Sequence, residues 1–298
     1  MECARVAAVA LLAVAGAGRA AEPGGLQIGM VQGMFRDIQP ALVQAMSRPL
    51  QELIRKQTGL TGDVEIVPDA FALADRMKAG RVHLGVFHGF EYAWVKAHNP
   101  DLVPLAISIP PTRHLEACVV VHADAKLSGL ADLKEESVVV PRMSKAHCHL
   151  YLERQRLALP NNCAVPKTKP SVTSEEALDA VVNGDAKAAL VDAAAITGYQ
   201  NLQPGAAKQL KVLCRSDAFP PGVIAYNRTT VDAATVERVR TLLTTANTNP
   251  AGKPLMMLWN LKGFEDVPDD YAARLDAILK AYPPPAPSAP PAGGSGGK

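Results

Sequence analysis

The sequence predicts an α/β protein of two lobes, and three observations support this fold class. Short apolar runs alternate with amphipathic helical segments from residue 26 to residue 282. The alternation occurs in two successive units, and the chain crosses between them twice, around residues 111–118 and 212–220. A length of 298 residues is sufficient for two lobes with separate cores.

The N-terminal segment, residues 1–21, has the pattern of a secretory signal peptide. Arg5 precedes an apolar run from Val6 to Ala15, and small residues allow cleavage after Ala20 or Ala21. The alternative is a retained anchor helix, but the apolar run is shorter than the ~20 residues that a membrane span needs. We therefore expect an exported, periplasmic protein.

The first lobe is predicted to comprise residues 26–114 and 217–282. It begins with a strand at 26–31 and a helix in which Leu42, Met46, Leu50 and Leu53 form an apolar stripe. Further strands and helices then alternate and return after the second crossover. We expect strands at 64–67, 82–87, 102–109 and 223–226, and helices at 71–79, 88–97, 231–246, 254–259 and 271–282.

The second lobe is predicted to comprise residues 115–216, including the hinge crossovers. We expect strands at 116–122, 136–140, near Ala164, at 187–191 and at 210–214, and helices at 146–157, 173–182 and 192–200. The tail at 283–298 is rich in Pro, Gly and Ser and lacks an apolar face, which predicts disorder.

The stretch from Val138 to Leu157 is the strongest candidate for a binding site. A β-branched strand ends at Pro141, a short loop follows, and a helix begins near Ala146. The N-terminus of a helix presents free N–H groups and a positive dipole end, so it attracts anions. Ser144 and Lys145 add a hydroxyl and an ammonium group. The alternative is that Ser144 only caps the helix and Lys145 is solvated.

Three segments carry a resemblance to a known family: MKAGRVHLGVFHGFEYAW, LSGLADLKEESVVVPRMSKAH and SEEALDAVVNGDAKAALVD. They resemble elements of phosphonate ABC-transporter substrate-binding proteins, the PhnD-like type 2 periplasmic binding proteins. The resemblance implies a Venus-flytrap fold in which each lobe is a mixed sheet flanked by helices, joined by a two-strand hinge. It also implies a small oxyanion ligand (a phosphonate, phosphate or phosphite), an ABC permease as partner, a monomer and no cofactor.

The resemblance also suggests ligand-binding positions. The family's cleft tyrosine and glycine fall on Tyr92 and Gly89, its helix N-terminal hydroxyl pair falls near Ser144 and Lys145, and its acidic strand end falls on Asp192. The chain departs from the family pattern at three places, one of which is Thr173-Ser174, where the family can carry a polar or imidazole residue. It has His88-Gly89 where Gly-Pro is common, and residues 144–149 replace the usual small hydroxyl residues.

Other residues after strand ends complete the predicted cleft: Phe35, Arg36, His88, Ala146 and His147. Arg36 and Arg113 could clamp an anion or be solvated. Asp192 could accept an amine or cap the next helix. Phe90 fits core packing slightly better than ligand contact.

We also considered metal binding and catalysis. His147 and His149 are two residues apart, so on a helix they point in opposing directions. A metal site built from His147, Cys148 and His149 would require an irregular first turn, or else one of these histidines would have to combine with His88 from the opposite lobe. No nucleophile elbow, HExxH or Walker motif is present, so the sequence does not predict an enzyme.

Removal of the signal peptide leaves four cysteines, Cys118, Cys148, Cys163 and Cys214, which allow three pairings. Because Cys118 and Cys214 lie on the two crossovers, a Cys118–Cys214 disulfide across the hinge is one hypothesis. The remaining pair would then be Cys148 with Cys163.

The function that the sequence favours is a periplasmic solute-binding component of an ABC-type uptake system. The net charge of +2 gives no indication of nucleic-acid binding. Two alternatives remain open: a sensing domain of the same fold that reports to a signalling partner, and a secreted metal- or redox-active protein that uses His147, Cys148 and His149.

Overall fold

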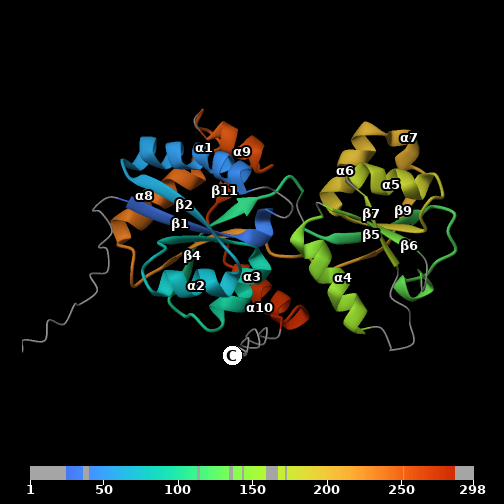
Figure 1. Cartoon of the computed structure of the whole chain (residues 1–298), viewed down its shortest axis with the longest axis horizontal. Helices are drawn as coiled ribbons and strands as arrows, with labels where there is room; N and C mark the ends of the chain where they lie inside the picture. The colour runs from blue at the N-terminus through green and yellow to red at the C-terminus, as the bar shows by residue number, and fades with distance from the viewer. Residues whose placement is uncertain are drawn as a thin grey trace, which may run out of the picture.

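The protein forms two α/β lobes that lie side by side (Figure 1). The computed structural model describes residues 25–35, 40–112, 115–133, 137–142, 144–158, 167–171, 173–250 and 252–285. The predicted signal peptide, Arg36, Arg113, Cys163 and residues 286–298 of the predicted disordered tail lie outside this set. Within it, no helix combines the length and the apolar character that a membrane crossing requires.

The sheet of the first lobe is mixed, with strand order β11-β4-β10-β3-β1-β2. β1 is parallel to β2 and β3, whereas β10 is antiparallel to β3 and β4. The strand bounds are β1 Gly25–Val31, β2 Thr61–Val67, β3 Leu84–Phe87, β4 Leu102–Ile109, β10 Val223–Asn227 and β11 Gly263–Glu265. The returning C-terminal part of the chain therefore supplies β10 and β11 to a sheet that the N-terminal part begins.

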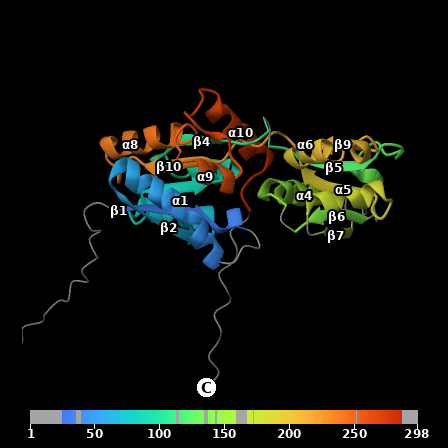
Figure 2. The same ribbon diagram turned by 90° about the horizontal axis from the view of Figure 1, so that it is seen from above.

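Helices cover both faces of this sheet (Figure 1), and Figure 2 shows the side that carries α1, α8 and α9. The helices on one face are α1 Pro40–Thr58, α8 Ala233–Thr244 and α9 Lys253–Leu258, and those on the other are α2 Ala70–Lys78, α3 Gly89–Lys96 and α10 Tyr271–Ala281. Alternation along β1 explains the two layers, since successive side chains of a strand point to opposite faces. Ile28 and Met30 pack in the α1 layer, and Val31 packs in the other.

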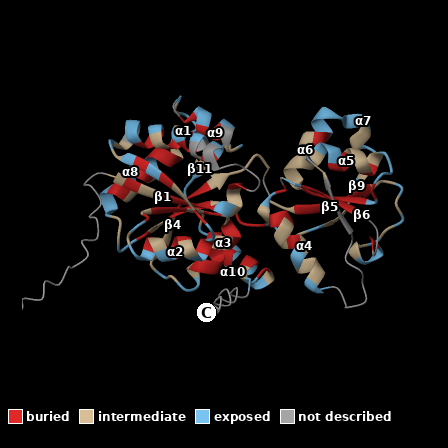
Figure 3. Ribbon diagram, in the orientation of Figure 1, coloured by how far each residue is buried: buried red, intermediate tan, exposed pale blue. Residues whose placement is uncertain are grey.

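The sheet of the second lobe is also mixed, with strand order β7-β6-β8-β5-β9. β6 is parallel to β7 and β8, and β5 is antiparallel to β8 and β9. The bounds are β5 Ala117–His122, β6 Ser137–Pro141, β7 Lys167–Ser171, β8 Ala188–Asp192 and β9 Leu210–Arg215. One face carries α5 Ser174–Val182 and α6 Ala193–Leu202, and the other carries α4 Ala146–Ala158. Both sheets lie in the buried interior of their lobes (Figure 3).

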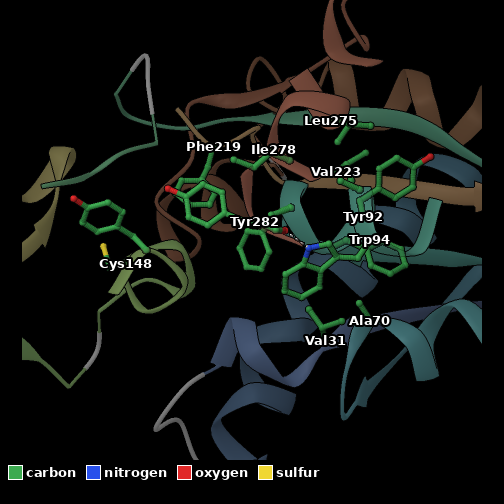
Figure 4. Packing of buried hydrophobic residues seen from close by; sticks show 14 of the residues in the cluster. Val31, Ala70, Tyr92, Trp94, Cys148, Phe219, Val223, Leu275, Ile278 and Tyr282 are labelled. Carbon is green, nitrogen blue, oxygen red and sulfur yellow. Dashed lines mark hydrogen bonds between the residues drawn. The ribbon is translucent and has the colours of Figure 1, made fainter. Parts of the chain in front are cut away.

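Two adjacent backbone segments connect the lobes. Leu115 and Phe219 form an antiparallel bridge in which the Phe219 N–H donates to the Leu115 carbonyl at 2.8 Å. Phe219 also packs against Phe90 of lobe 1 and His147 of lobe 2, with centroid distances of 5.9 and 5.4 Å. Figure 4 shows Phe219 beside Tyr282, between Cys148 of lobe 2 and Trp94 of lobe 1. The buried cluster is thus continuous across the hinge.

The predicted α/β class, with its two mixed sheets, is confirmed. The strand expected near Ala164 falls outside the described residues, and the strand observed after α4 is β7. β11 was not predicted, because three residues are too few for a visible alternation. The short helices η1 Gln32–Phe35, η2 Leu130–Leu133 and α7 Pro204–Ala207 were also missed.

Candidate functional site

A cavity of about 360 Å³ opens between the two lobes. Lobe 2 lines it with the start of α4, and lobe 1 lines it with loops that follow β1 and β3. Of the predicted site residues, those that line the cavity are His88, Ser144, Lys145, Ala146 and His147. The carboxyl ends of β1, β3 and β6 lead into these segments, which is where open α/β sheets bind their ligands.

Ser144 lies in the loop that connects β6 to α4. Its N–H donates to the carbonyl of Pro141 at 3.0 Å, which forms a tight turn before the helix. Its side chain is buried, and the Oγ atom has no hydrogen-bond partner among the described residues. A buried hydroxyl without a partner carries a free-energy cost that a bound acceptor would remove.

His147, in the first turn of α4, is 5% exposed. Its ring is hydrogen-bonded to the backbone of Glu116, while its Nε2 atom has no partner among the described residues. Burial lowers the His147 pKa to about 4; Asp192 acts in the opposite direction, and Lys145 and His88 add to the lowering. At neutral pH this imidazole is therefore neutral.

Lys145 and Asp192 form an ion pair with an Nζ–Oδ2 distance of 2.8 Å. Asp192 also caps α6, because its Oδ1 accepts from the Ala195 N–H at 2.7 Å. The capping interpretation of Asp192 is therefore the one that the structure supports. Lys145 lines the cavity with its charge partly compensated by this carboxylate.

His88 stands on the lobe 1 side, at the N-terminus of α3. Its Nδ1 lies 2.7 Å from Glu91 Oε2, and its ring stacks on Phe90 with a centroid distance of 5.3 Å. These two contacts orient the imidazole. Gly33 packs beside the pair, because a Cβ there would lie 3.6 Å from Glu91 Oε1.

Three predicted ligand contacts are corrected by the structure. Tyr92 is fully buried, and its hydroxyl donates to the Leu102 carbonyl at 3.1 Å, so it belongs to the core of lobe 1. Gly89 faces the hinge, where a Cβ would approach the Pro220 carbonyl oxygen to 2.4 Å. Phe35 is buried against Trp259 with a centroid distance of 5.4 Å. Arg36 lies outside the described residues.

The hypothesis of a Cys118–Cys214 disulfide is also corrected, because both residues are free cysteines in the structure. In the β5–β9 register, Cys118 pairs with Arg215 and Cys214 pairs with Val119. The two thiols therefore point to opposite faces of the sheet. Cys118 joins the cluster under α5 and α6, and Cys214 accepts a hydrogen bond from the Tyr151 hydroxyl at 3.5 Å.

The structure does not support the metal alternative. No group of three or more His, Cys, Asp or Glu side chains suited to a metal ion occurs in the part of the chain that is described. Cys148 is fully buried, and burial raises its thiol pKa well above the usual value. Because α4 is a regular helix from Ala146, His147 and His149 diverge.

Several residues that line the cavity were not predicted. They include Ser108 at the end of β4, Gly222 before β10, and Trp259 after α9. Ser108 is the second-last residue of β4 and lies just before Pro110-Pro111, so the strand-end rule could have identified it. No local pattern distinguishes Trp259, which reaches the cavity only through the packing of the C-terminal segment.

The comparisons with known proteins agree with this geometry. The family model of ABC transporter, phosphonate, periplasmic substrate-binding proteins matches residues 33–271, which is more than half of the chain. A search of curated proteins finds no significant match.

Solved structures show the same fold at low sequence identity. A Xanthomonas citri protein bound to ATP is 15% identical, with a TM-score of 0.61 over 87% of this chain and 97% of that chain. PhnD1 from Prochlorococcus marinus, in complex with methylphosphonate, is 12% identical, with a TM-score of 0.58 over 87% and 98%. A binding protein component of an ABC phosphonate transporter from Pseudomonas aeruginosa is 16% identical, with a TM-score of 0.57 over 87% and 86%. On the evidence of the family match, the chain belongs to the periplasmic substrate-binding proteins of ABC phosphonate transporters.

Proposed function

We propose that this protein binds a small oxyanion, with phosphonates as the first candidate class, in the cavity between its lobes and delivers it to an ABC permease. Family membership supports the transport role. The observation that carries the site is the pair of buried atoms Ser144 Oγ and His147 Nε2. Both lack partners among the described residues, and both lie at the N-terminus of α4 in the cavity that His88 lines from the other lobe.

In this proposal the oxyanion accepts hydrogen bonds from Ser144 Oγ and from backbone N–H groups at the start of α4. The first N–H groups of a helix lack the partner one turn earlier, although in α4 the Cys148 N–H already donates to the Lys145 carbonyl at 2.9 Å, and the helix dipole favours negative charge there. Lys145 supplies positive charge from the same turn. His88 contacts the ligand from lobe 1, held in place by Glu91.

Contacts from both lobes give the ligand a differential affinity for the closed arrangement. A ligand that binds the closed state more tightly shifts the population towards it, and the paired crossovers at Leu115 and Phe219 are the segments about which the lobes would move. We further infer that residues 1–21 are removed on export and that the mature protein acts in the periplasm as a monomer.

A calorimetric titration tests the site directly. Methylphosphonate, phosphate, phosphite and methanesulfonate are first compared by thermal shift, and the best binder is then titrated into the wild type and Ser144→Ala. Because a hydrogen bond to a charged group contributes about 1.5–3 kcal/mol, we expect roughly ten- to hundredfold weaker binding by the variant.

Ser47→Ala is the matched control, because Ser47 is also buried but its hydroxyl already donates to the Val43 carbonyl at 2.9 Å. It should leave the affinity unchanged. Unchanged affinity of Ser144→Ala would refute the assigned role, and the absence of binding by all four anions would refute oxyanion binding itself.

A further inference from the structure

The cavity between the lobes does not end at the polar cleft. From the cleft it continues into lobe 1, between the sheet and the helices α1, α8 and α9. Its inner wall is apolar and includes Ile28, Leu50, Ile54, Leu84, Leu242 and Leu255. We call this inner part the apolar chamber.

Two unpartnered polar atoms of the cavity, Ser144 Oγ and His147 Nε2, lie on the lobe 2 side. Trp259, whose buried Nε1 also has no partner among the described residues, follows α9 and packs against the apolar cluster that supplies the inner wall. The inner wall itself offers aliphatic side chains. A water molecule in such a place would lack the two to four hydrogen-bond partners that buried water needs.

Protein interiors normally pack as densely as organic crystals, and the walls of a cavity forgo dispersion contacts. A chamber under α1 therefore costs stability, and an apolar occupant would recover those contacts. The side chains that face it from β1 include Met30 near the cleft and Ile28 two residues further in. Two residues of a strand span about 7 Å, roughly the length of a pentyl chain.

We propose that the ligand is an amphipathic oxyanion, whose charged head binds at Ser144 and the N-terminus of α4 and whose aliphatic or aromatic substituent occupies the apolar chamber. This inference rests on the oxyanion site proposed above and specifies the class of substrate. The chamber acts as the selective element, because the head site alone would bind every oxyanion of suitable size. Substituent length and bulk then decide which of them is retained.

The test is a series of n-alkylphosphonates from methyl to octyl, titrated calorimetrically into the mature protein. Burial of each methylene is expected to tighten binding two- to fourfold until the chamber is filled, at about five or six carbons. Beyond that length the affinity should level off or fall. Affinity that is flat or falls from methyl to hexyl overturns the inference while leaving the oxyanion site intact, and failure of every member to bind overturns the oxyanion site.

Variants of the chamber wall make the test specific. Ile28→Phe fills the chamber, so the increase in affinity with alkyl chain length should stop at a shorter chain than in the wild type. Binding of methylphosphonate shows that this variant is folded. Leu50→Ala enlarges the chamber, so the alkyl chain length that binds most tightly should be greater than in the wild type.

Leu53→Ala is the matched control, since Leu53 is buried on the same helix but does not line the cavity. It should lower stability without moving the optimum. If Ile28→Phe does not fold, the inference is tested by comparing the chain-length dependence of affinity in Leu50→Ala with that in Leu53→Ala. An identical chain-length profile in Leu50→Ala, Leu53→Ala and the wild type overturns the inference.

Discussion

His147 illustrates at the scale of one residue how burial prepares a binding site. The neutral imidazole donates one ring N–H to the Glu116 backbone, so the unpartnered Nε2 is an acceptor, which can bind a protonated ligand oxygen and becomes a donor only when the ring is protonated. Its folded pKa of about 4 lies below the unfolded value of ~6.5. Between these values the unfolded chain binds more protons, so His147 reduces stability as pH falls through this window and has no effect above it.

We therefore expect the ligand-free protein to lose on the order of 1–3 kcal/mol between pH 6.5 and 4 through this residue. His147→Gln should flatten that part of the stability profile, measured by denaturant unfolding at a series of pH values. An anion beside the ring favours the imidazolium. Methanesulfonate, whose charge is constant over this range, should thus bind the wild type more tightly at pH 5 than at pH 7. An identical pH dependence in His147→Gln would contradict this role.

At the scale of elements, the N-termini of α4 and α6 are linked by the Lys145–Asp192 ion pair. Asp192 caps α6 and at the same time draws the Lys145 ammonium towards itself. The carboxylate therefore weakens the positive potential of the site while it stabilises the neighbouring helix. The two roles can be separated, because an asparagine side chain caps a helix about as well as an aspartate.

Asp192→Asn is expected to keep the cap and to release the charge of Lys145. Stability should change by less than about 1 kcal/mol, and oxyanion affinity should rise severalfold at low ionic strength. Asp192→Ala, which also loses the cap, should cost about 1 kcal/mol more in thermal or denaturant unfolding. Weaker binding by Asp192→Asn would mean instead that the carboxylate orients Lys145 for the ligand.

At the scale of the whole molecule, the hinge is under tight steric restraint. Gly89 begins α3 directly against the second crossover, where a Cβ would lie 2.4 Å from the Pro220 oxygen and 2.6 Å from the Pro221 oxygen. Phe219, two residues earlier than Pro221, bridges the aromatic groups of both lobes. Movement of the lobes therefore has to occur around this contact.

Gly89→Ala should displace the crossover, destabilise the protein by roughly 1–3 kcal/mol and weaken ligand binding. Gly198→Ala is the matched control within a helix, because no atom lies within 4 Å of the Cβ it would add. This control should be neutral or stabilising by up to about 1 kcal/mol, with unchanged affinity. Equal effects of the two substitutions would argue against a steric role for the hinge contact.

The sequence by itself determined the alternation of strands and helices, because side-chain periodicity is a local property. It also identified the start of α4 as a candidate site, since a strand end followed by Ser144 and a helix N-terminus is a local pattern. The hypothesis of a disulfide across the hinge is wrong because Cys118 pairs with Arg215, the residue next to Cys214, in the β5–β9 ladder. Cys118 and Cys214 therefore lie on opposite faces of the sheet.

Only the tertiary structure decided which polar groups line the cavity. Tyr92 follows a strand end as His88 does, yet its phenol turns into lobe 1 and bonds to Leu102, while His88 remains in the cavity. The partner of Lys145 and the apolar chamber under α1 likewise depend on contacts between segments far apart in the chain. Local periodicity shows which face of an element is apolar, but the volume left between two packed faces depends on the tertiary packing of both elements.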